Sequence, residues 1–348
     1  MAELLSLVVD GYALQGFQSV RISRSVEAAA IAFELAATNP AWSSEAGRLR
    51  QCKLVEIYTI ENGALGAFGG GDLACAGYVD EYAAQVSPGS RRVSVSGRSK
   101  AADAIDCEPV RHETGFVENK DLAGVAEEFD EWGVGFDALS SLPTIPMVQR
   151  SPGEPLFATL EREARRQGLF LTGQPDGSVQ IARGPGPRHA GGLVEGAAPL
   201  IRYRLRDQMN VAFSECVVRG QKSEGVEEDD LRQEETASSE TYGRHRPLLI
   251  ENEGSNESED LRERAQWELD RRNGARLAVQ VTVSTWRDEA GELWAPRNLL
   301  YVDLPSEELA TDLAIQAVEF VQELGEGEGC GTFAELTLVL PETLGSAA

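Results

Sequence analysis

Hydrophobic and polar residues alternate over many short stretches of the first hundred residues. In Arg92–Ser96, for example, Val93 and Val95 share one side. A period of two, with turn residues between the runs, is typical of half-buried antiparallel strands. Further strands are predicted over residues 5–9, 17–22, 31–35, 54–58 and 76–86. The stretch Gly63–Gly71 is predicted to be a loop, because glycine is entropically costly inside a regular element.

The apolar pattern changes to a helical period after residue 118. Asn119 is predicted to cap a helix that ends at Gly133. The buried stripe of this helix is predicted to consist of Leu122, Val125, Ala126, Phe129 and Trp132. A second helix is predicted over 154–167, with Pro155 in its first turn and Gly168 after its end. A hairpin turning at 175–177 follows, and the Gly- and Pro-rich stretch 184–192 is predicted to be a linker.

The last third of the chain returns to the strand pattern. Strands are predicted over 211–219, 277–283, 299–304, 313–321 and 336–340, the last two forming a long hairpin around 325–331. Residues 224–240 hold eight acids and one arginine, which indicates a solvated acidic loop. A helix is predicted over 256–273, where Asn256 and Glu259 form a capping box. The predicted fold class is therefore α+β, mainly antiparallel β, with two β regions around an α-containing middle.

The charge of the chain limits its partners. It has 32 basic and 57 acidic residues among 348, a net charge of −25. Because such a protein repels phosphate, we expect neither nucleic-acid binding nor attraction to anionic lipid. No apolar run approaches the ~18 residues of a membrane span, and the first ten residues lack a basic signal region. We therefore expect no direct membrane anchor.

The sequence offers little catalytic or metal-binding chemistry. The three histidines (His112, His189 and His245) have no ligand partner at zinc spacing, and no phosphate-binding glycine motif occurs. The pair Asp80/Glu81 has the chemistry of a glycosidase, but with 57 acids such pairs arise by chance. The five cysteines are widely spaced, which favours reduced thiols and leaves an intermolecular disulfide open: Cys52, Cys75, Cys107, Cys216 and Cys330. We assign no catalytic, cofactor or metal residue and predict a non-enzyme.

Several segments, in the same order along residues 5–341, are similar to one protein family. They are residues 19–27, 33–35, 75–80, 95–100, 102–107, 217–220, Tyr242 with 246–250, and 291–296. On these segments the chain resembles the baseplate hub proteins of Mu-like contractile-tailed bacteriophages, the tail protein P family. Two segments depart from the family pattern by being longer, namely Gly63–Gly71 and residues 224–240.

The resemblance implies a structural role and a homotrimer. Each chain would contribute two small tube-like β-barrels, in domains 1–108 and 193–348, joined by an α/β middle domain with linker at 109–192. Three chains would form a trimeric ring of six barrels that adapts the six-fold tail tube to the three-fold central spike. Its channel would pass the tape-measure protein and then DNA. The acidic composition suggests an acidic channel wall, and the tip 325–331 is a candidate contact with another tail component.

The same resemblance implies a location in the tail baseplate of the virion, next to other baseplate proteins, after assembly in the host cytoplasm. No cofactor and no specific nucleic-acid binding are implied. Three alternatives stay open at this point. The chain could be the hub module of a contractile bacteriocin or secretion apparatus, a cell-wall hydrolase, or a carbohydrate-binding β-protein. Gene neighbours separate the first of these from a phage hub, and a peptidoglycan assay separates the second.

Overall fold

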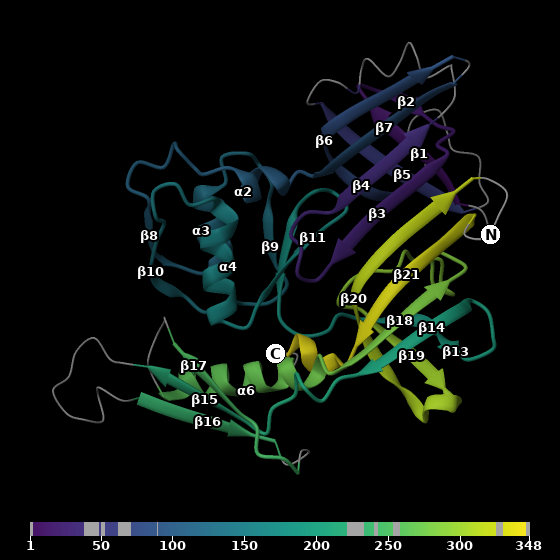
Figure 1. Ribbon diagram of the computed structural model, residues 1–348. Coiled ribbons are helices and arrows are strands. Elements are labelled where there is room, and N and C mark those ends of the chain that lie inside the picture. Colours follow the sequence, from purple (N-terminus) through teal and green to yellow (C-terminus); the bar gives the residue numbers. More distant parts are fainter. Residues whose placement is uncertain are drawn as a thin grey trace.

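One large sheet dominates the structure. The computed structural model describes residues 3–37, 49, 53–61, 71–88, 90–220, 233–239, 243–252, 258–324 and 330–345. Among these residues, thirteen strands belong to this sheet, and only the pairing of β13 with β19 within it is parallel. The sheet curves through the right half of the view in Figure 1, and the helices lie beside it. The predicted class, mainly antiparallel β with few helices, is confirmed.

The first β region contains seven strands in the spatial order β2-β1-β5-β6-β7-β4-β3. They are β1 (Glu3–Val9), β2 (Tyr12–Leu14), β3 (Ser19–Ser25), β4 (Ala32–Ala37), β5 (Leu54–Glu61), β6 (Asp72–Ser87) and β7 (Ser90–Ser99). The period-two runs of the sequence fall on β1, β3, β4, β5, β6 and β7, so these predicted strands are confirmed. Residues 62–70, where the glycine loop was predicted, lie outside the described residues.

The second β region contains six strands in the order β13-β19-β20-β21-β18-β14. They are β13 (Arg188–Val194), β14 (Leu200–Asp207), β18 (Leu277–Val283), β19 (Leu299–Leu304), β20 (Leu309–Glu323) and β21 (Gly331–Val339). Two short 3-10 helices accompany them, η2 (Pro305–Glu307) and η3 (Pro341–Leu344). The predicted long hairpin is β20–β21, and its predicted tip lies, for residues 325–329, outside the described residues.

Five strands of each region repeat the same topology. In chain order the sets are β3 to β7 and β14, β18, β19, β20, β21, and both have the spatial order third-fourth-fifth-second-first. Neighbours within both sets are antiparallel. The long hairpins also share a bulge, because one extra residue interrupts the register between Val79 and Glu81 in β6 and between Ile315 and Ala317 in β20. A bulge at the same place in both hairpins indicates that the two regions are structural repeats.

The two regions join edge to edge through β3 and β20. Residues Ala317–Glu323 of β20 pair with β3, whereas the first half of the same strand pairs with β19. The family resemblance led us to expect two small tube-like barrels in each chain. Within the described residues, however, the pairings close neither region into a barrel, because β3 pairs with β20 instead of returning to β2. The bulge turns β20 from one neighbour to the next, so a single sheet runs through both regions.

The middle of the chain forms an α/β unit on one side of the sheet (Figure 1). Its elements are α2 (Ala102–Asp106), β8 (Phe116–Lys120), α3 (Leu122–Phe129), β9 (Phe136–Ala138), β10 (Ile145–Gln149), α4 (Leu156–Arg166), β11 (Phe170–Gly173) and β12 (Val179–Ala182). The predicted α3 cap is wrong: the Asp121 side chain accepts the N–H of Gly124 at 2.8 Å, and Asn119 lies within β8 with φ of +52°. The helix ends at Phe129, before Gly133, because the carboxylate of Asp130 accepts the N–H groups of the next turn.

A small three-stranded sheet covered by a helix projects from the second β region. It consists of β15 (Glu215–Gly220), β16 (Gln233–Ser238), β17 (Pro247–Glu251) and α6 (Ser258–Gly274). The predicted helix is confirmed from Ser258 onward, and its predicted cap Asn256 lies outside the described residues. Part of the predicted acidic loop is wrong, since residues 233–238 are a strand paired with β15, and residues 221–232 lie outside the described residues. The linker predicted over 184–192 is also corrected, because β13 occupies its second half and pairs in parallel with β19.

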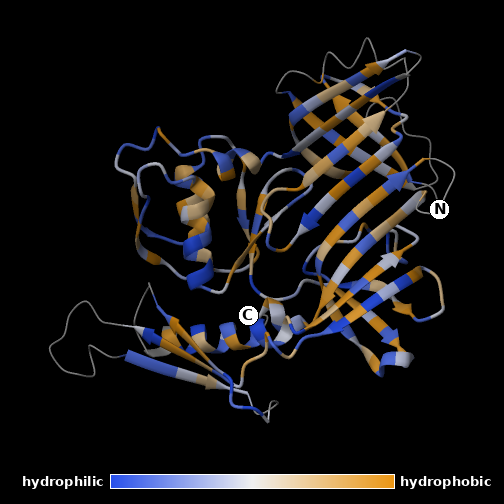
Figure 2. Ribbon diagram, viewed as in Figure 1, coloured by the Kyte–Doolittle hydropathy of each residue, from blue (hydrophilic) through white to orange (hydrophobic). Residues whose placement is uncertain are grey.

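Along most strands of the large sheet, every second side chain points into the hydrophobic core. Figure 2 shows apolar and polar residues alternating along the strands of the large sheet. One hydrophobic cluster spans both β regions and includes Leu7, Ile22, Phe320, Trp286 and Trp294. Separate clusters lie in the middle unit and under α6. Among the described helices, none combines the length and hydrophobicity that a membrane crossing demands.

Candidate functional site: the polar seam between the β regions

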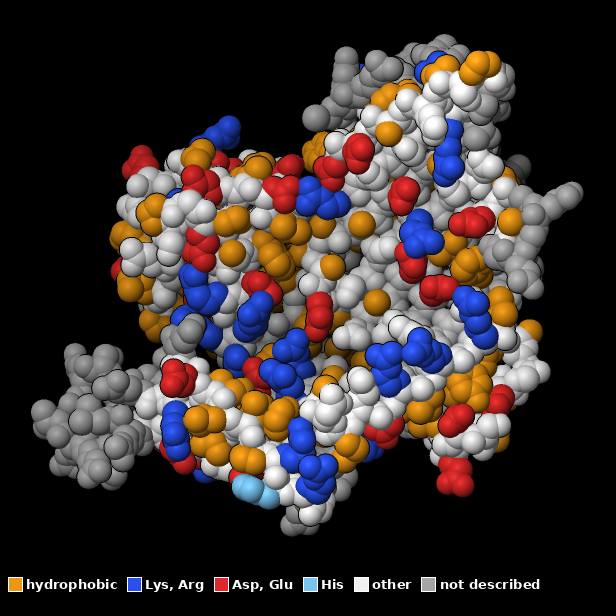
Figure 3. All heavy atoms as spheres, viewed as in Figure 1, with side chains coloured by type: hydrophobic (Ala, Val, Ile, Leu, Met, Phe, Trp, Pro, Cys, Tyr) orange, Lys and Arg blue, Asp and Glu red, His pale blue; other side chains and the backbone are white. Residues whose placement is uncertain are grey.

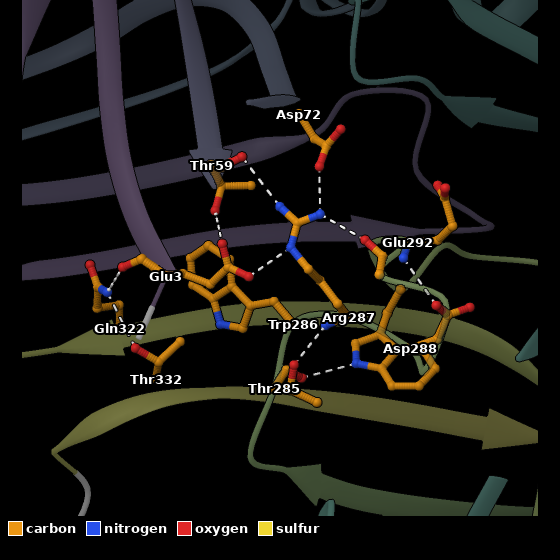
Figure 4. A network of polar contacts seen from close by, with 12 residues as sticks. Glu3, Thr59, Asp72, Thr285, Trp286, Arg287, Asp288, Glu292, Gln322 and Thr332 are labelled. Atoms are coloured by element: carbon orange, nitrogen blue, oxygen red, sulfur yellow. Dashed lines mark hydrogen bonds and ion pairs between the residues drawn. The ribbon is translucent and has the colours of Figure 1, made fainter. Parts of the chain in front are cut away.

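A buried arginine connects the second β region to the first. Arg287 lies in the hairpin that follows β18, and only 6% of its surface is exposed. Its Nε donates to Glu3 Oε1 at 2.8 Å, and its Nη2 donates to the carbonyl of Thr59 at 3.2 Å. Its Nη1 contacts Asp72 and the carbonyl of Gly291. Figure 4 shows the guanidinium between β1, β5 and β6 of the first region and its own hairpin.

Glu3 receives contacts from three directions. Besides Arg287, the hydroxyl of Thr59 donates to Oε2 of Glu3 at 2.5 Å. The amide of Gln322 in β20 donates to the main-chain oxygen of Glu3 at 2.7 Å and to the Thr332 hydroxyl at 3.2 Å. Strand β1, the β5–β6 edge and the β20–β21 hairpin therefore meet at one carboxylate residue. We call these five residues (Glu3, Thr59, Arg287, Gln322 and Thr332) together with Asp72 the polar seam.

The charges of the polar seam compensate each other. Burial opposes the charge on Arg287, but the hydrogen bonds that the guanidinium donates to the carboxylates of Glu3 and Asp72 outweigh it and raise the pKa of the guanidinium. A buried ion pair whose polar atoms are all engaged fixes relative orientation more than it adds net stability. The seam can therefore hold the two β regions at one angle.

Asp288, the residue after Arg287, binds the same hairpin to the second β region. Asp288 Oδ2 lies 2.9 Å from His189 Nδ1 and accepts the N–H of Ala190 at 3.1 Å. The N–H groups of Ala290 and Glu292 donate to the other carboxylate oxygen. Burial opposes ionisation of Asp288, but these donors outweigh it and lower the pKa of the carboxyl group. Arg287 therefore binds the hairpin to the first β region, and Asp288 binds it to the second.

The His189–Asp288 pair resembles part of a catalytic triad, but its geometry excludes that role. Both side chains are only 3% exposed. His189 Nε2 accepts the N–H of Ala295 at 3.2 Å and lies 3.3 Å from Asn298 Nδ2. A catalytic base needs a free nitrogen facing substrate. Since both ring nitrogens are engaged within the protein, the pair serves to position the hairpin.

The other chemical candidates from the sequence remain scattered. His112 accepts the N–H of Gly115 at 3.1 Å, and His245 is exposed. Asp80 is bound to Arg98 at 2.7 Å next to the β6 bulge and does not form an acid–base pair with Glu81. Among the described residues, no group of three His, Cys, Asp or Glu could hold a metal. Cys75, Cys107, Cys216 and Cys330 are free thiols, whereas Cys52 lies outside the described residues.

The comparison with protein families matches both β regions. Residues 4–99 match the family described as Mu phage baseplate assembly protein GpP-like, N-terminal. Residues 257–346 match the fourth domain of Mu phage baseplate assembly protein GpP. Together these matches cover more than half of the 348 residues. The chain belongs to the Mu-like baseplate hub family. The resemblance stated from the sequence is confirmed.

Individual relatives agree with this family and cover nearly the whole hub chain. Baseplate hub protein gp44 of Escherichia phage Mu is 26% identical, over 97% of this chain and 88% of the relative. The 43 kDa tail protein of prophage MuSo2 from Shewanella oneidensis has a TM-score of 0.80 at 25% identity, covering 98% and 99% of the two chains. The tail protein of Neisseria meningitidis MC58 has a TM-score of 0.79 at 18% identity, covering all of both chains. These relatives are tail and baseplate proteins, which supports a structural role in a phage tail.

Sequence reasoning did not find the polar seam. Arg287 and Asp288 stand just before residues 291–296, one of the segments that carries the family resemblance. From the sequence alone, a charged pair next to a turn is predicted to lie exposed at the surface. The one signal was Trp286 beside them, since a large aromatic residue is often buried and the N–H of a buried tryptophan usually finds a hydrogen-bond partner. Its Nε1 does donate to the carbonyl of Phe333 at 2.8 Å.

Proposed function

We propose that this protein is a trimeric baseplate hub that adapts the six-fold tail tube to the three-fold central spike. The repeated topology of the two β regions is the observation that carries this proposal. A chain with two equivalent units gives six units in a ring of three, which matches a six-fold partner on one side and a three-fold partner on the other. The polar seam supports it further, because an adaptor needs a fixed angle between its two units.

The assembled hub would contact the tail tube, the spike and other baseplate proteins, and its channel would pass the tape-measure protein and DNA. We place it in the tail baseplate of the virion, assembled in the host cytoplasm. For its domains we propose divisions near 108 and 192, supported by separate hydrophobic clusters in the β part and in the middle unit, with α2 and the first half of β13 lying just across these boundaries. The small β15–β17 sheet is then an insertion in the third domain.

We assign the channel wall to the outer face of the large sheet, between β14 and β7. Outward positions of β3, β4 and β7 are mostly Ser and Ala, which present little apolar surface. The charged outward residues are Arg21, Arg92, Arg98, Arg202, Arg204, Arg206, Glu34, Glu319, Glu323 and Glu335. Figure 3 shows acidic and basic side chains interspersed over this side of the molecule. The proposed wall therefore carries mixed charge, with six arginines and four glutamates among the described residues, unlike the acidic wall that the net charge suggested.

Such a wall suits a transported polymer. Arg21 pairs with Glu319 at 3.2 Å and Arg202 pairs with Glu335 at 3.2 Å, so part of the charge is neutralised within the wall. Small hydroxyl side chains offer neither an apolar patch nor a dense run of one charge to which a passing chain would adhere.

Native mass spectrometry of the purified full chain tests the proposal. We expect a particle of three times the 37.6 kDa chain mass. A particle of one, two or four chains at micromolar concentration would contradict the adaptor function. A peptidoglycan assay checks the competing hydrolase function. We expect no turnover, and turnover abolished by a single carboxylate substitution would replace our proposal.

A further inference from the structure

Within the described residues, the structural repeat has two unpaired strand edges that correspond to the two edges joined by the β3–β20 pairing. In that pairing, the first strand of one repeat, β3, lies beside the fourth strand of the other, β20. The equivalent of β3 is β14, whose pairing within the described residues is with β18 alone. The equivalent of β20 is β6, whose second half, Glu81–Ser87, pairs with β7 alone among those residues. Exposed edges of this length are normally blocked in native proteins.

We infer that β14 of one copy pairs with the second half of β6 of the next copy, repeating the β3–β20 junction between chains. The inference rests on the proposed trimer and specifies its contact. Figure 1 places β14 and the β6–β7 hairpin at opposite ends of the β part, as a head-to-tail ring requires. The same junction would then occur within each chain and between chains.

The shared bulge fixes the register of this contact. Because Ala317 and Glu81 each follow the bulge, they are equivalent, and the strand pairings make Arg21 equivalent to Arg204. Within the chain Arg21 lies opposite Val321, whose equivalent in β6 is Gln85. The inferred opposite pairs are Ser87 with Arg202, Val86 with Tyr203, Gln85 with Arg204, Ala84 with Leu205, and Ala83 with Arg206.

Burial supports this register. At the β3–β20 pairing, the core-facing residues of β20 are covered, with Val318 and Phe320 each 1% exposed. Val86 occupies the equivalent core-facing face of β6 but is 70% exposed. Tyr203 and Leu205, which would lie opposite Val86 and Ala84, are only partly buried against the core. Adding a strand at this edge covers these apolar side chains and satisfies both rows of backbone groups.

Charge also favours this partner. Arg204 and Arg206 are exposed, and no ion pair of theirs occurs within the described residues. At the bulge of β6, Asp80 is paired with Arg98 of its own chain, whereas Glu81 is exposed, and the inferred register brings Glu81 diagonally next to Arg206. Opposite charges at such positions favour strand pairing. The arginine edge of one copy therefore meets the Glu81 carboxylate on the next.

Disulfide trapping tests the register directly. In a background with Cys52, Cys107 and Cys330 changed to Ser, Gln85→Cys is combined with Arg204→Cys. Opposite residues in antiparallel strands lie about 4.5–5.5 Å apart, within disulfide range. Mild oxidation is expected to give a covalent particle of three chains on denaturing, non-reducing gels. The matched control combines Ser87→Cys with Arg206→Cys, a displacement of four residues or about 13 Å, and is expected to stay unlinked.

A surface variant tests the same contact without cysteines. Val86→Lys changes a residue that is 70% exposed in the single chain, so its fold is expected to be preserved. Placing a charge in the covered contact is expected to raise the dissociation constant of the trimer at least about tenfold. Val110→Lys is the matched control, because Val110 is 72% exposed outside both strands. Circular dichroism and melting of both variants check the fold.

The outcomes separate this inference from the proposed function. A three-chain mass without the Gln85–Arg204 link, or with a link in the displaced control, overturns the strand pairing and leaves the trimeric hub intact. A three-chain mass that Val86→Lys does not weaken also overturns the pairing. A one-chain mass for the parent protein overturns the ring and the inference together.

Discussion

Arg287 Nε lies 2.8 Å from Glu3 Oε1, although 284 positions of the chain separate the two residues. Both belong to the polar seam and both are buried. The pair connects the start of β1 with the hairpin after β18, so the angle between the two β regions depends on it.

Arg287→Met is expected to lower the free energy of unfolding by about 3–5 kcal/mol, because it leaves the Glu3 carboxylate buried without its cation. The double variant Glu3→Gln/Arg287→Met is expected to recover part of this loss, since neither charge remains. Urea unfolding followed by fluorescence measures both. Arg21→Met, which removes an exposed ion pair, is the control and is expected to cost less than about 1 kcal/mol. Equal costs for the buried and exposed pairs would contradict the role of the seam.

The lowered pKa of Asp288 predicts a loss of stability in acid. A carboxyl group whose pKa is lower in the folded state contributes stability above its unfolded pKa, near 3.9, and loses it as the pH falls through the folded pKa. The parent protein is therefore expected to lose stability below about pH 4 more steeply than Asp288→Asn. Urea midpoints between pH 6 and pH 2.5 test this. The control Asp137→Asn changes an exposed carboxylate and should leave the parent slope intact.

Gly168 is expected to be irreplaceable at the contact between α4 and α6. It has φ of +64°, and a Cβ there would lie 2.9 Å from Cδ1 of Trp267 in α6. Trp267 itself lies between the guanidinium groups of Arg264 and Arg271, at 5.3 and 5.4 Å from its ring centre. Gly168→Ala is expected to cost the about 1–2 kcal/mol of a left-handed alanine plus about 1–3 kcal/mol of overpacking.

Gly133→Ala is the matched control for this substitution. Gly133 has φ of +70°, but nothing lies within 4 Å of its added Cβ. Only the backbone cost is expected there, so thermal unfolding should separate the two variants by at least about 1 kcal/mol. If both variants melt together, Trp267 does not pack against Gly168 as described.

Gly97→Ala is expected to disrupt the first β region. An added Cβ would lie 2.1 Å from the carbonyl oxygen of Tyr78 and 2.5 Å from Cζ of Phe33. Backbone cannot retreat from such a contact as a flexible side chain can, so we expect loss of soluble trimer in native mass spectra. Gly243→Ala, whose Cβ would meet nothing within 4 Å, is the control and is expected to behave like the parent protein.

The sequence predicted strands well where one face alone is buried. β18 and β19 match the predicted residues 277–283 and 299–304. Apolar and polar residues alternate in such strands because antiparallel sheets commonly bury one face and leave the other polar. It failed for β13, because glycine and proline around 184–192 indicate a linker unless the parallel partner β19 is known. It also missed β14, in which Arg202, Arg204 and Arg206 make the strand look like surface.

The joining of the two regions could not be read from the sequence. An alternating pattern fixes which face of β3 is buried but not which strand lies beside it. The partner β20 is almost three hundred residues away, and its bulge, which redirects the strand, leaves no distinctive residue type. The resemblance to phage hub proteins supplied the family, and the coordinates supplied the repeated topology and the polar seam.

The β3–β20 pairing has a consequence for biosynthesis. Strand β3 leaves the ribosome long before its partner, Ala317–Glu323 of β20. During most of translation the first β region must therefore wait with an unpartnered edge, a state that favours misassociation between nascent chains. Productive folding then depends on how quickly the β20–β21 hairpin pairs with β3 once it has been synthesised.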